Sequence, residues 1–383
     1  MKIVCIAASF IPSKTANSIQ VVKATQALAD LGHEVTLLVP GQVQTDWLDL
    51  ERHYGLRRQF KIQWVPENLT FRRYDFAFKA LKLARQMAPD IIYTWVLQAG
   101  VLALWQGVPV VLELHDRVRG KVGPWLFRWF YRSKTPRRLL TNTHALKNAL
   151  ITDFKLDTAK LDIHVAPNGV DLERYQNLLS SEESRQNLSL PAGFTAGYSG
   201  HFYAGRGLQL MLEMAKQLSA IQFLWVGGEA ADVAEWRARI DRQNIMNVTI
   251  TGFVNNIEVA QYQAAADVLL MPYSSSIAGS GGGNSAEIAS PMKMFEYLAA
   301  GRAIVSSDLP VVHEVLNKEN AVFCPPEDLS AWCKAISDLH ADPDRRKQLG
   351  AAARSTAENY TWRARAESAL ESFPSLDDGT TEQ

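Results

Sequence analysis

The amino-acid sequence predicts an α/β protein made of two doubly wound parallel sheets in series. In the first half, short β-branched runs alternate with amphipathic segments, as the strands and helices of a parallel sheet do. The same alternation restarts after the turn signal Ala-Pro-Asn-Gly-Val-Asp at residues 166–171. The length of 383 residues also favours two domains, because single hydrophobic cores stop growing near ~250–300 residues. We therefore expect two Rossmann-like domains that face each other across a ligand-binding cleft.

The first half supplies the elements of the first sheet. A helix is expected from about residue 19 to residue 31, where Gly32 ends it. An uncharged run at residues 91–112 is long enough to cross a bilayer, but glycines, a proline and glutamines interrupt it, which favours strand, helix and strand. The expected strands are residues 2–9, 34–39, 90–94 and 109–114.

The second half repeats the pattern, with a helical stretch after each strand. One helix of about ten residues has Ser290 as its N-cap, Pro291 as its first residue and Gly301 at its end. The expected strands are residues 194–199, 222–226, 247–251, 267–272 and 303–306. The expected domains are residues 1–167 with a returning helix at about 361–375, and residues 168–360, followed by a polar tail at 376–383.

Composition excludes several classes of protein. Lys plus Arg and Asp plus Glu both number 40, so the net charge does not indicate a nucleic-acid binder. The three cysteines, Cys5, Cys324 and Cys333, have no metal-binding spacing and are too few for a disulfide framework, which fits a reducing compartment. We expect a cytoplasmic protein with no bound metal or other cofactor.

An unusual helix start indicates an anion-binding site. Under the expected capping, Lys293 takes the third helical position, where a cation opposes the helix dipole by about 0.3–1 kcal/mol unless an anion compensates. Free helix N–H groups, the lysine and the glycine-rich residues 279–283 together suit a diphosphate. Glu296, one turn later, could accept both hydroxyls of a ribose. A surface ion pair between Lys293 and Glu296 is the alternative interpretation.

The segment around Lys293 and Glu296 covers residues 290–310 and reads Ser-Pro-Met-Lys-Met-Phe-Glu-Tyr-Leu-Ala-Ala-Gly-Arg-Ala-Ile-Val-Ser-Ser-Asp-Leu-Pro. It resembles the donor-binding helix and following strand of the retaining glycosyltransferases of family 4, which have the GT-B fold. Other segments resemble that family's motifs in the same order along almost the whole chain. They are its interdomain turn (168–171), its phosphate-binding loop (198–207), its base-binding strand ends (226–228 and 251–254), and the segments 267–273 and 360–366.

The resemblance implies roles for individual residues. Glu296 would bind the donor's ribose, while Arg206 and Lys293 would hold the diphosphate and stabilise it as it leaves. His115, at the end of a strand of the amino-terminal domain, would contact the donor sugar near the reacting centre. Asn17 occupies the place of the family's amino-terminal glycine pair, together with Ser18, which is also a plausible helix N-cap.

The chain departs from the family pattern at two places. Ile288 stands where the family has the first of two paired glutamates, so that either the neighbouring Glu287 or backbone groups near Ser290 would contact the sugar. His201 stands where many members have a basic phosphate-binding residue. The base-binding strand ends correspond to Gly227 and Val254.

The implied activity is transfer of a sugar from a UDP- or GDP-linked donor to a glycan or lipid-linked acceptor, with retention of configuration and without a metal. This activity would belong to cell-surface polysaccharide or glycolipid biosynthesis. A non-catalytic nucleotide-sugar-binding or scaffold subunit is an alternative, because the first glutamate is missing. An NAD-dependent dehydrogenase is a further alternative, because Gly281-x-Gly283-x-x-Ala286 fits a dinucleotide fingerprint, although residues 274–280 separate it from the preceding strand.

Residues 117–138 combine eight basic side chains with aromatic ones and contain no acidic residue. This mixture suits an anionic membrane surface, and we expect a peripheral contact with the inner face of the membrane. A solvated basic face with its aromatic residues in the core is the alternative. The basic residues are Arg117, Arg119, Lys121, Arg128, Arg132, Lys134, Arg137 and Arg138.

Overall fold

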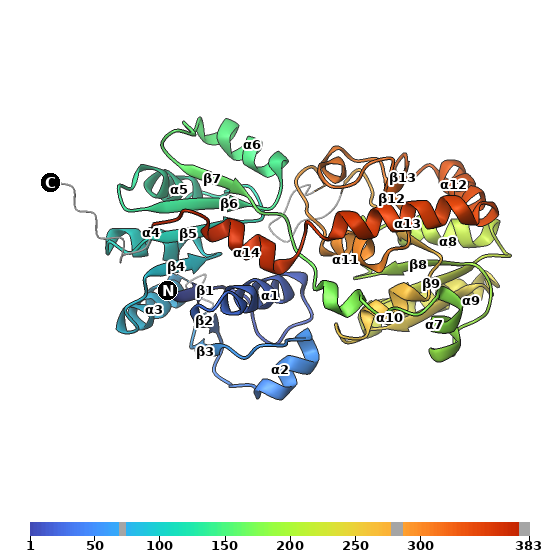
Figure 1. Ribbon diagram of the computed structural model, residues 1–383, viewed down its shortest axis with the longest axis horizontal. Coiled ribbons are helices and arrows are strands. Elements are labelled where there is room, and N and C mark those ends of the chain that lie inside the picture. Colours follow the sequence, from blue (N-terminus) through green and yellow to red (C-terminus); the bar gives the residue numbers. More distant parts are fainter. Residues whose placement is uncertain (69–73, 277–285, 375–383) are drawn as a thin grey trace. The chain divides into compact units, whose positions relative to one another are not determined.

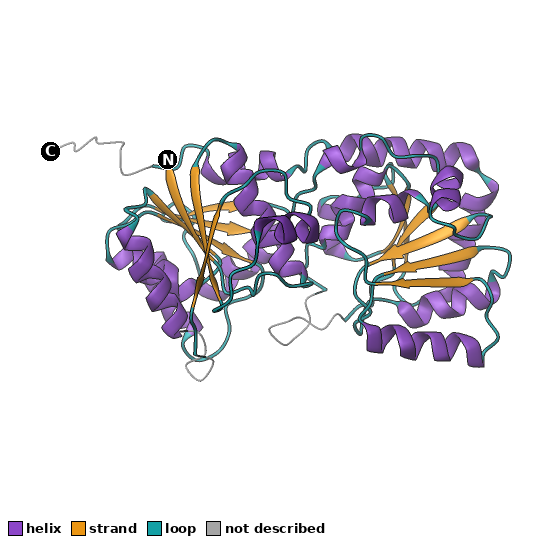
Figure 2. Cartoon of the chain, turned by 90° about the horizontal axis from the view of Figure 1, so that it is seen from below, coloured by secondary structure: helices purple, strands orange, loops and turns teal. Residues whose placement is uncertain are grey.

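A computed structural model of the protein describes residues 1–68, 74–276 and 286–374. The chain divides into two compact units. The amino-terminal unit comprises residues 1–168 together with the chain from residue 362 onward, and the carboxy-terminal unit comprises residues 169–361. These boundaries lie one residue from the expected ones. Each unit is a sheet with helices on both faces (Figures 1 and 2).

The described part of the amino-terminal unit contains a seven-stranded sheet in the order β3-β2-β1-β4-β5-β6-β7, and all paired strands are parallel. The strand order reverses between β1 and β4, which makes this point of the sheet the expected place for a ligand. The strands are β1 (Lys2–Ile6), β2 (Glu34–Pro40), β3 (Lys61–Val65), β4 (Ile91–Thr94), β5 (Val110–Leu114), β6 (Arg137–Thr141) and β7 (Asp162–Val165).

Helices cover this sheet on both faces, and the last of them comes from the far end of the chain. Helix α14 packs beside α1, so the expected return of the carboxy-terminal helix is confirmed (Figure 1). The uncharged run at residues 91–112 forms β4, α4 and β5, and no helix of the described residues is long and apolar enough to cross a membrane. The helices are α1 (Ala16–Asp30), α2 (Trp47–Tyr54), α3 (Tyr74–Gln86), α4 (Leu97–Trp105), α5 (Gly123–Arg132), α6 (His144–Phe154) and α14 (Trp362–Leu370).

The described part of the carboxy-terminal unit contains a six-stranded parallel sheet in the order β10-β9-β8-β11-β12-β13. The order reverses between β8 and β11. Large side chains such as Trp225 and Trp332 are fully buried in its core. The strands are β8 (Thr195–Ser199), β9 (Gln222–Val226), β10 (Val248–Gly252), β11 (Val268–Met271), β12 (Ala303–Ser307) and β13 (Ala321–Cys324).

The helices of this unit include the one singled out from the sequence, but its start differs from the expectation. Pro291, not Ser290, is the N-cap of α11, because Pro291 has an extended backbone (φ −69°, ψ 126°). Lys293 is therefore the second helical residue and not the third. Gly301 ends the helix in a left-handed conformation (φ 62°), as expected. The elements are η2 (Leu172–Tyr175), α7 (Ser181–Asn187), α8 (Leu208–Gln217), α9 (Ala230–Arg242), α10 (Val259–Ala264), α11 (Met292–Ala300), η3 (Pro310–Glu314), α12 (Leu329–Ala341) and α13 (Pro343–Ala357).

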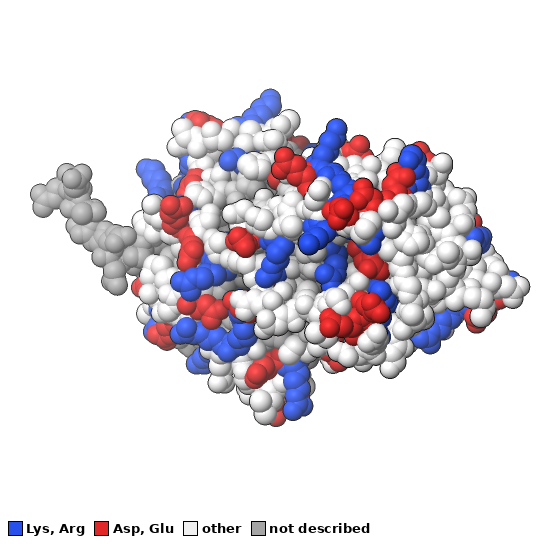
Figure 3. Space-filling view, turned by 45° about the vertical axis from the view of Figure 1, so that its right-hand side comes forward, with Lys and Arg blue, Asp and Glu red and all other residues white. Residues whose placement is uncertain are grey.

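The surface carries mixed charge, in keeping with the net charge of zero. On the face that Figure 3 draws, basic side chains are interspersed with acidic ones. Any preference for an anionic ligand must therefore arise from a local arrangement of side chains and not from the field of the whole molecule.

Candidate functional site

Three segments of the carboxy-terminal unit meet at the edge of the sheet where its strand order reverses. The loops after β8, β9 and β11 begin at Gly200, Gly227 and Pro272, and carboxyl ends of parallel strands share one edge. Gly227 has a φ of 116°, and a Cβ at this position would lie 2.3 Å from the carbonyl oxygen of Gly200. Only glycine lets these two loops approach so closely.

The ammonium group of Lys293 points into this meeting point. Its Nζ is buried and has no hydrogen-bond partner within the described residues. It lies 3.7 Å from the centroid of the Tyr198 ring, and a Cβ at Gly200 would come within 2.7 Å of it. Burial, with a smaller contribution from the charge of Arg206, lowers the pKa of Lys293 well below its ordinary value. A buried cation in this state is unfavourable, and an anion bound beside it would relieve the cost.

Arg206 adds a second cation to the same place. Its guanidinium group lies over the ring of Tyr273, 4.9 Å from the centroid, and Lys293 Nζ lies 5.6 Å from the same ring. The backbone fixes this arrangement at Gly207, where a Cβ would lie 1.9 Å from the carbonyl oxygen of Pro272. Two cations that share one aromatic ring repel each other, so the site favours a ligand with at least two negative charges.

Glu296 lies one helical turn after Lys293. Its Oε2 accepts a hydrogen bond of 3.2 Å from Gln263 Nε2, which also donates to Ser199 Oγ at 3.0 Å. A carboxylate can accept further hydrogen bonds, so this group can bind vicinal hydroxyls as well. Lys293 Nζ, by contrast, is buried and has no hydrogen-bond partner among the described residues, so it forms no surface ion pair with Glu296. The alternative of a surface ion pair is therefore wrong.

The other sequence-predicted residues of this unit follow the ends of its strands or lie just before α11. His201 follows β8, and its ring stacks on Tyr203 with centroids 4.8 Å apart. Val254 follows β10 and packs against an apolar cluster that includes Val226. Ser290 is buried directly before α11. The glycines at residues 279–283 lie outside the described residues.

Ile288, which stands where the family has its first glutamate, is a buried apolar residue. Ile288 is buried and 3% exposed, whereas the neighbouring Glu287 is exposed. The nearest carboxylate to the family's first glutamate position therefore faces solvent, while the side chain at that position belongs to the core.

In the amino-terminal unit, His115 belongs to a buried network at the end of β5. Its Nε2 lies 2.5 Å from Oε1 of Glu113, which also accepts hydrogen bonds from Gln20 Nε2 (2.7 Å) and a guanidinium N–H of Arg365 (2.5 Å). The other carboxylate oxygen accepts the hydroxyl of Tyr93 at 2.5 Å. Burial raises the pKa of Glu113, but Arg365, His115 and Tyr93 outweigh it and bring the pKa to about 2. The carboxylate is thus ionised and fixes the orientation of the imidazole ring.

The sequence-based interpretation missed this network, although one signal was present. Glu113 is a charged residue inside the otherwise apolar strand β5, and such a residue must find partners when it is buried. Its partner Arg365 comes from α14, and no local pattern could pair two residues so far apart in the chain.

Asn17 lies in the first turn of α1, where its amide donates a hydrogen bond of 2.8 Å to Ser9 Oγ. The N-cap of this helix is Thr15, whose side chain accepts from the backbone N–H of Ser18. The expectation that Ser18 caps the helix is wrong, because its hydroxyl is buried and donates to the carbonyl of Ser13 at 2.7 Å.

Comparison with known proteins identifies the family. The model described as Glycosyltransferase Family 4 matches residues 18–174, and the model described as Glycosyl transferases group 1 matches residues 193–342. The chain belongs to glycosyltransferase family 4. Together the two matches span most of both units of this glycosyltransferase.

Solved structures show the same fold for this glycosyltransferase. HepE from Anabaena, in complex with UDP, is 16% identical with a TM-score of 0.73, over 97% of this chain and 99% of that one. Sucrose-phosphate synthase from Thermosynechococcus elongatus is 17% identical with a TM-score of 0.74, over 96% and 97%. The fold is GT-B, as the sequence predicted.

Relatives of the glycosyltransferase are about a quarter identical to it over the aligned residues. TuaH from Bacillus subtilis, named as a teichuronic acid biosynthesis glycosyltransferase, is 26% identical over 50% of this chain, and the match spans only 46% of TuaH. A D-inositol 3-phosphate glycosyltransferase from Pseudarthrobacter chlorophenolicus is 25% identical over 74% of this chain and 70% of its own length.

Proposed function

We propose that this glycosyltransferase moves a sugar, of the hexose type, from a UDP- or GDP-linked donor to an acceptor, with retention of anomeric configuration. The observation that carries the proposal is the buried ammonium of Lys293. It has no hydrogen-bond partner within the described residues and shares an aromatic ring with Arg206 at the start of α11. A diphosphate supplies the two negative charges that this arrangement favours.

The same groups can assist bond cleavage. As the bond between sugar and diphosphate breaks, negative charge grows on the leaving oxygen, and fixed cations stabilise that charge more than they stabilise the ground state. Lys293, Arg206 and the N–H groups of α11 supply this stabilisation, so the proposed reaction needs no metal. Glu296 binds the ribose. The imidazole ring of His115, which the carboxylate of Glu113 orients, contacts the donor sugar.

The remaining donor contacts follow the family resemblance. We assign the base to the strand ends at Gly227 and Val254, and further donor contacts to His201 and Asn17. Contacts to the sugar hydroxyls then come from Glu287 or from the backbone near Ser290. Retention requires the acceptor to attack from the face that the diphosphate leaves.

The acceptor class is supported by the names of relatives. TuaH is named for teichuronic acid biosynthesis, whereas the name of SQD2 of Arabidopsis thaliana, a sulfoquinovosyl transferase that is 23% identical, gives the transferred sugar and not the acceptor. We propose a glycan or lipid-linked acceptor of cell-surface biosynthesis. A lipid-linked acceptor requires peripheral contact with the inner face of a membrane, to which the exposed basic side chains among residues 117–138 are suited.

Ligand-dependent thermal unfolding tests the donor. UDP or GDP at 100 times its dissociation constant should stabilise the protein by ~2.7 kcal/mol, and NAD should not. Stabilisation by NAD alone would refute the proposal in favour of the dehydrogenase alternative.

Turnover is then tested with UDP- and GDP-sugars by measuring release of the nucleoside diphosphate and the anomeric configuration of the product. Nucleotide binding without release or transfer for any donor and acceptor would favour the non-catalytic alternative. The buried Ile288 in place of a glutamate is the observation that keeps this alternative open.

A further inference from the structure

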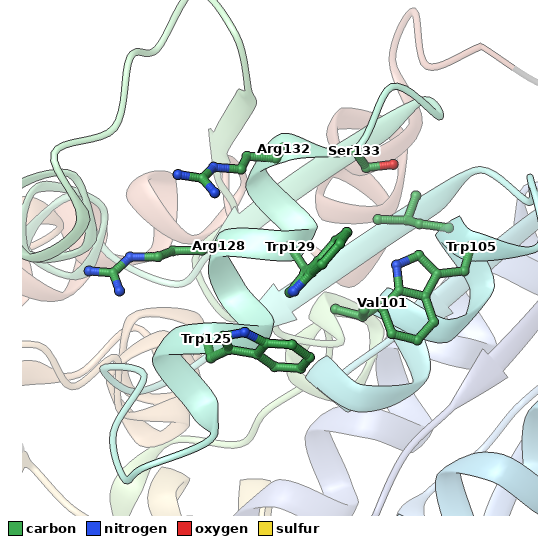
Figure 4. A pocket seen from close by; sticks show the side chains of 8 residues that line it. Val101, Trp105, Trp125, Arg128, Trp129, Arg132 and Ser133 are labelled. Atoms are coloured by element: carbon green, nitrogen blue, oxygen red, sulfur yellow. The ribbon is translucent and has the colours of Figure 1, made fainter.

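Three exposed indole rings gather on the surface of the amino-terminal unit. Trp105 is the last residue of α4, and Trp125 and Trp129 lie one turn apart on α5 (Figure 4). They are 56%, 52% and 47% exposed and surround a hollow of about 330 Å³. The ring of Trp129 meets those of Trp105 and Trp125 edge to face, with centroids 5.7 and 5.9 Å apart. We call this feature the tryptophan hollow.

The helix that carries two of these rings already has a separate core face. Leu126, Phe127 and Phe130 are the buried residues of α5, and Phe127 packs on Phe154 with centroids 4.5 Å apart. The fold therefore does not need the two tryptophans of α5. Single exposed apolar residues are ordinary, but clustered indoles around a hollow are typical of a binding surface.

Two arginines border the tryptophan hollow. Arg128 and Arg132 line it, lie one turn apart on α5, and extend their exposed guanidinium groups side by side (Figure 4). Within the described residues neither forms an ion pair, and α5 itself contains no acidic residue. These cations are therefore available to an anionic partner.

Three other arginines of residues 117–138 form hydrogen bonds or ion pairs within the amino-terminal unit. Fewer basic side chains are therefore available to a membrane than the sequence alone suggests. Arg117 donates to the carboxylate of Asp153 at 3.1 Å, and Arg138 is buried and pairs with Asp162 at 2.6 Å. Arg137 donates to backbone carbonyl groups. These three arginines are therefore engaged within the amino-terminal unit.

We propose that the tryptophan hollow docks the protein onto a bilayer that contains anionic phospholipids. Indole rings prefer the boundary between headgroups and acyl chains, because one edge is apolar and the N–H remains polar. The guanidinium groups of Arg128 and Arg132 then bind lipid phosphates, and each basic residue near such a surface strengthens binding about fivefold. The docking does not depend on the donor chemistry of the carboxy-terminal unit.

Two other occupants fit less well. A sugar requires hydrogen-bond acceptors as well as donors, but the polar groups of the lining are guanidinium and indole N–H donors and the hydroxyl of Ser133, whose oxygen already accepts from the backbone N–H of Thr135. A second copy of the chain, docked symmetrically, would bring Arg128 and Arg132 of both copies to one contact, where like charges repel.

Vesicle flotation tests the proposal with the full-length protein. Vesicles of phosphatidylcholine alone are compared with vesicles containing 30 mol% phosphatidylglycerol, a composition chosen to be on the order of natural anionic surfaces. Wild type should float with the anionic vesicles at low salt. Arg128→Gln/Arg132→Gln should weaken partition about 30-fold, and Trp125→Ala/Trp129→Ala at least about tenfold.

Matched variants control for loss of charge and of aromatic surface. Arg242→Gln/Lys347→Gln removes two exposed cations from the carboxy-terminal unit, and Phe78→Ala removes a side chain that is 63% exposed on α3. Both should partition like wild type. All variants should keep the wild-type affinity for UDP, which separates failure of docking from failure of the donor proposal.

Several outcomes would overturn the docking proposal. They are absence of flotation with anionic vesicles, equal flotation with neutral vesicles, and unchanged partition of both hollow variants. If gel filtration shows a concentration-dependent dimer for wild type but a monomer for Trp125→Ala/Trp129→Ala, the hollow binds a second copy of the chain instead. Competition of vesicle binding by a soluble oligosaccharide would assign it to a glycan.

Discussion

Replacement of Lys293 by methionine should stabilise the free protein and weaken donor binding at the same time. In the free protein the Nζ of Lys293 is buried without a hydrogen bond from or to any described residue, and it is stabilised by the Tyr198 ring at 3.7 Å and, more weakly, by the Tyr273 ring at 5.6 Å and the charge of Glu296. A desolvated cation–π contact gives about 2 kcal/mol, while burial of an unpaired charge opposes it by several kcal/mol. Methionine has a similar length and no charge, so we expect a gain of about 1–2 kcal/mol.

Binding of a diphosphate should change in the opposite direction. Loss of one charge-assisted hydrogen bond weakens binding by about 1.5–3 kcal/mol, which is about 10- to 150-fold in the dissociation constant. Urea unfolding without ligand measures the first effect, and titration calorimetry with UDP measures the second. A merely structural lysine would give neither pattern.

Lys23 provides a matched control in the amino-terminal unit. It is 2% exposed like a core residue, but its Nζ donates a hydrogen bond of 2.7 Å to the carbonyl of Gly55. Lys23→Met should destabilise the protein by about 1–3 kcal/mol and leave UDP affinity unchanged. The reasoning about Lys293 is refuted if Lys293→Met destabilises the free protein and binds UDP as wild type does.

Three further predictions follow from the two buried sites. Glu296→Ala should weaken UDP about tenfold or more but leave inorganic pyrophosphate unaffected in calorimetry, because the carboxylate serves the ribose; equal loss for both ligands would contradict this role. Burial lowers the pKa of Lys293 in the free protein and a bound diphosphate should raise it again, so binding of UDP should be accompanied by proton uptake and affinity should rise as pH falls toward the pKa of the free protein; calorimetry in buffers of different ionisation enthalpy measures the uptake, and Lys293→Met should abolish it. The pKa of Glu113 is about 2 in the folded protein and about 4.3 in the unfolded chain, so the carboxylate stabilises the fold fully above about pH 4.3 and this stabilisation is lost as pH falls toward 2. Glu113→Gln should remove this pH dependence of the free energy of unfolding, measured in urea. It should also lower that free energy by about 3–5 kcal/mol at neutral pH, since Arg365 then lacks a charged partner.

The fold could be predicted from the sequence because its strongest strands are buried on both faces. Runs such as those of β1, β9 and β11 are nearly continuous in apolar residues, and strand β9 has the bounds that were expected. Four strands were missed. Strands β3, β7 and β13 lie at the edges of their sheets, and β6 begins with two arginines. Edge strands and charged strand ends lack the apolar signal on which the prediction depends.

The donor site was predicted only as far as local spacing allowed. Lys293 and Glu296 could be found because they share one helix. The two tyrosine rings beside the cations could not be found in this way, since Tyr198 lies near the end of β8 and Tyr273 just after β11, and these strands meet only in the folded sheet. The N-cap was misplaced by one residue because a proline can adopt either the capping or the first helical position.

The attachment of α14 to the amino-terminal unit has a consequence for biosynthesis. During translation, residues 1–168 emerge with Glu113 already in the middle of β5, but its buried cationic partner is Arg365. Until that residue leaves the ribosome, the carboxylate must stay hydrated or protonated, because an ionised group without a counter-charge is not tolerated in a core. The hydrogen-bond network around His115 is thus completed only after the whole carboxy-terminal unit has been synthesised. The amino-terminal unit, although synthesised first, reaches its final structure last.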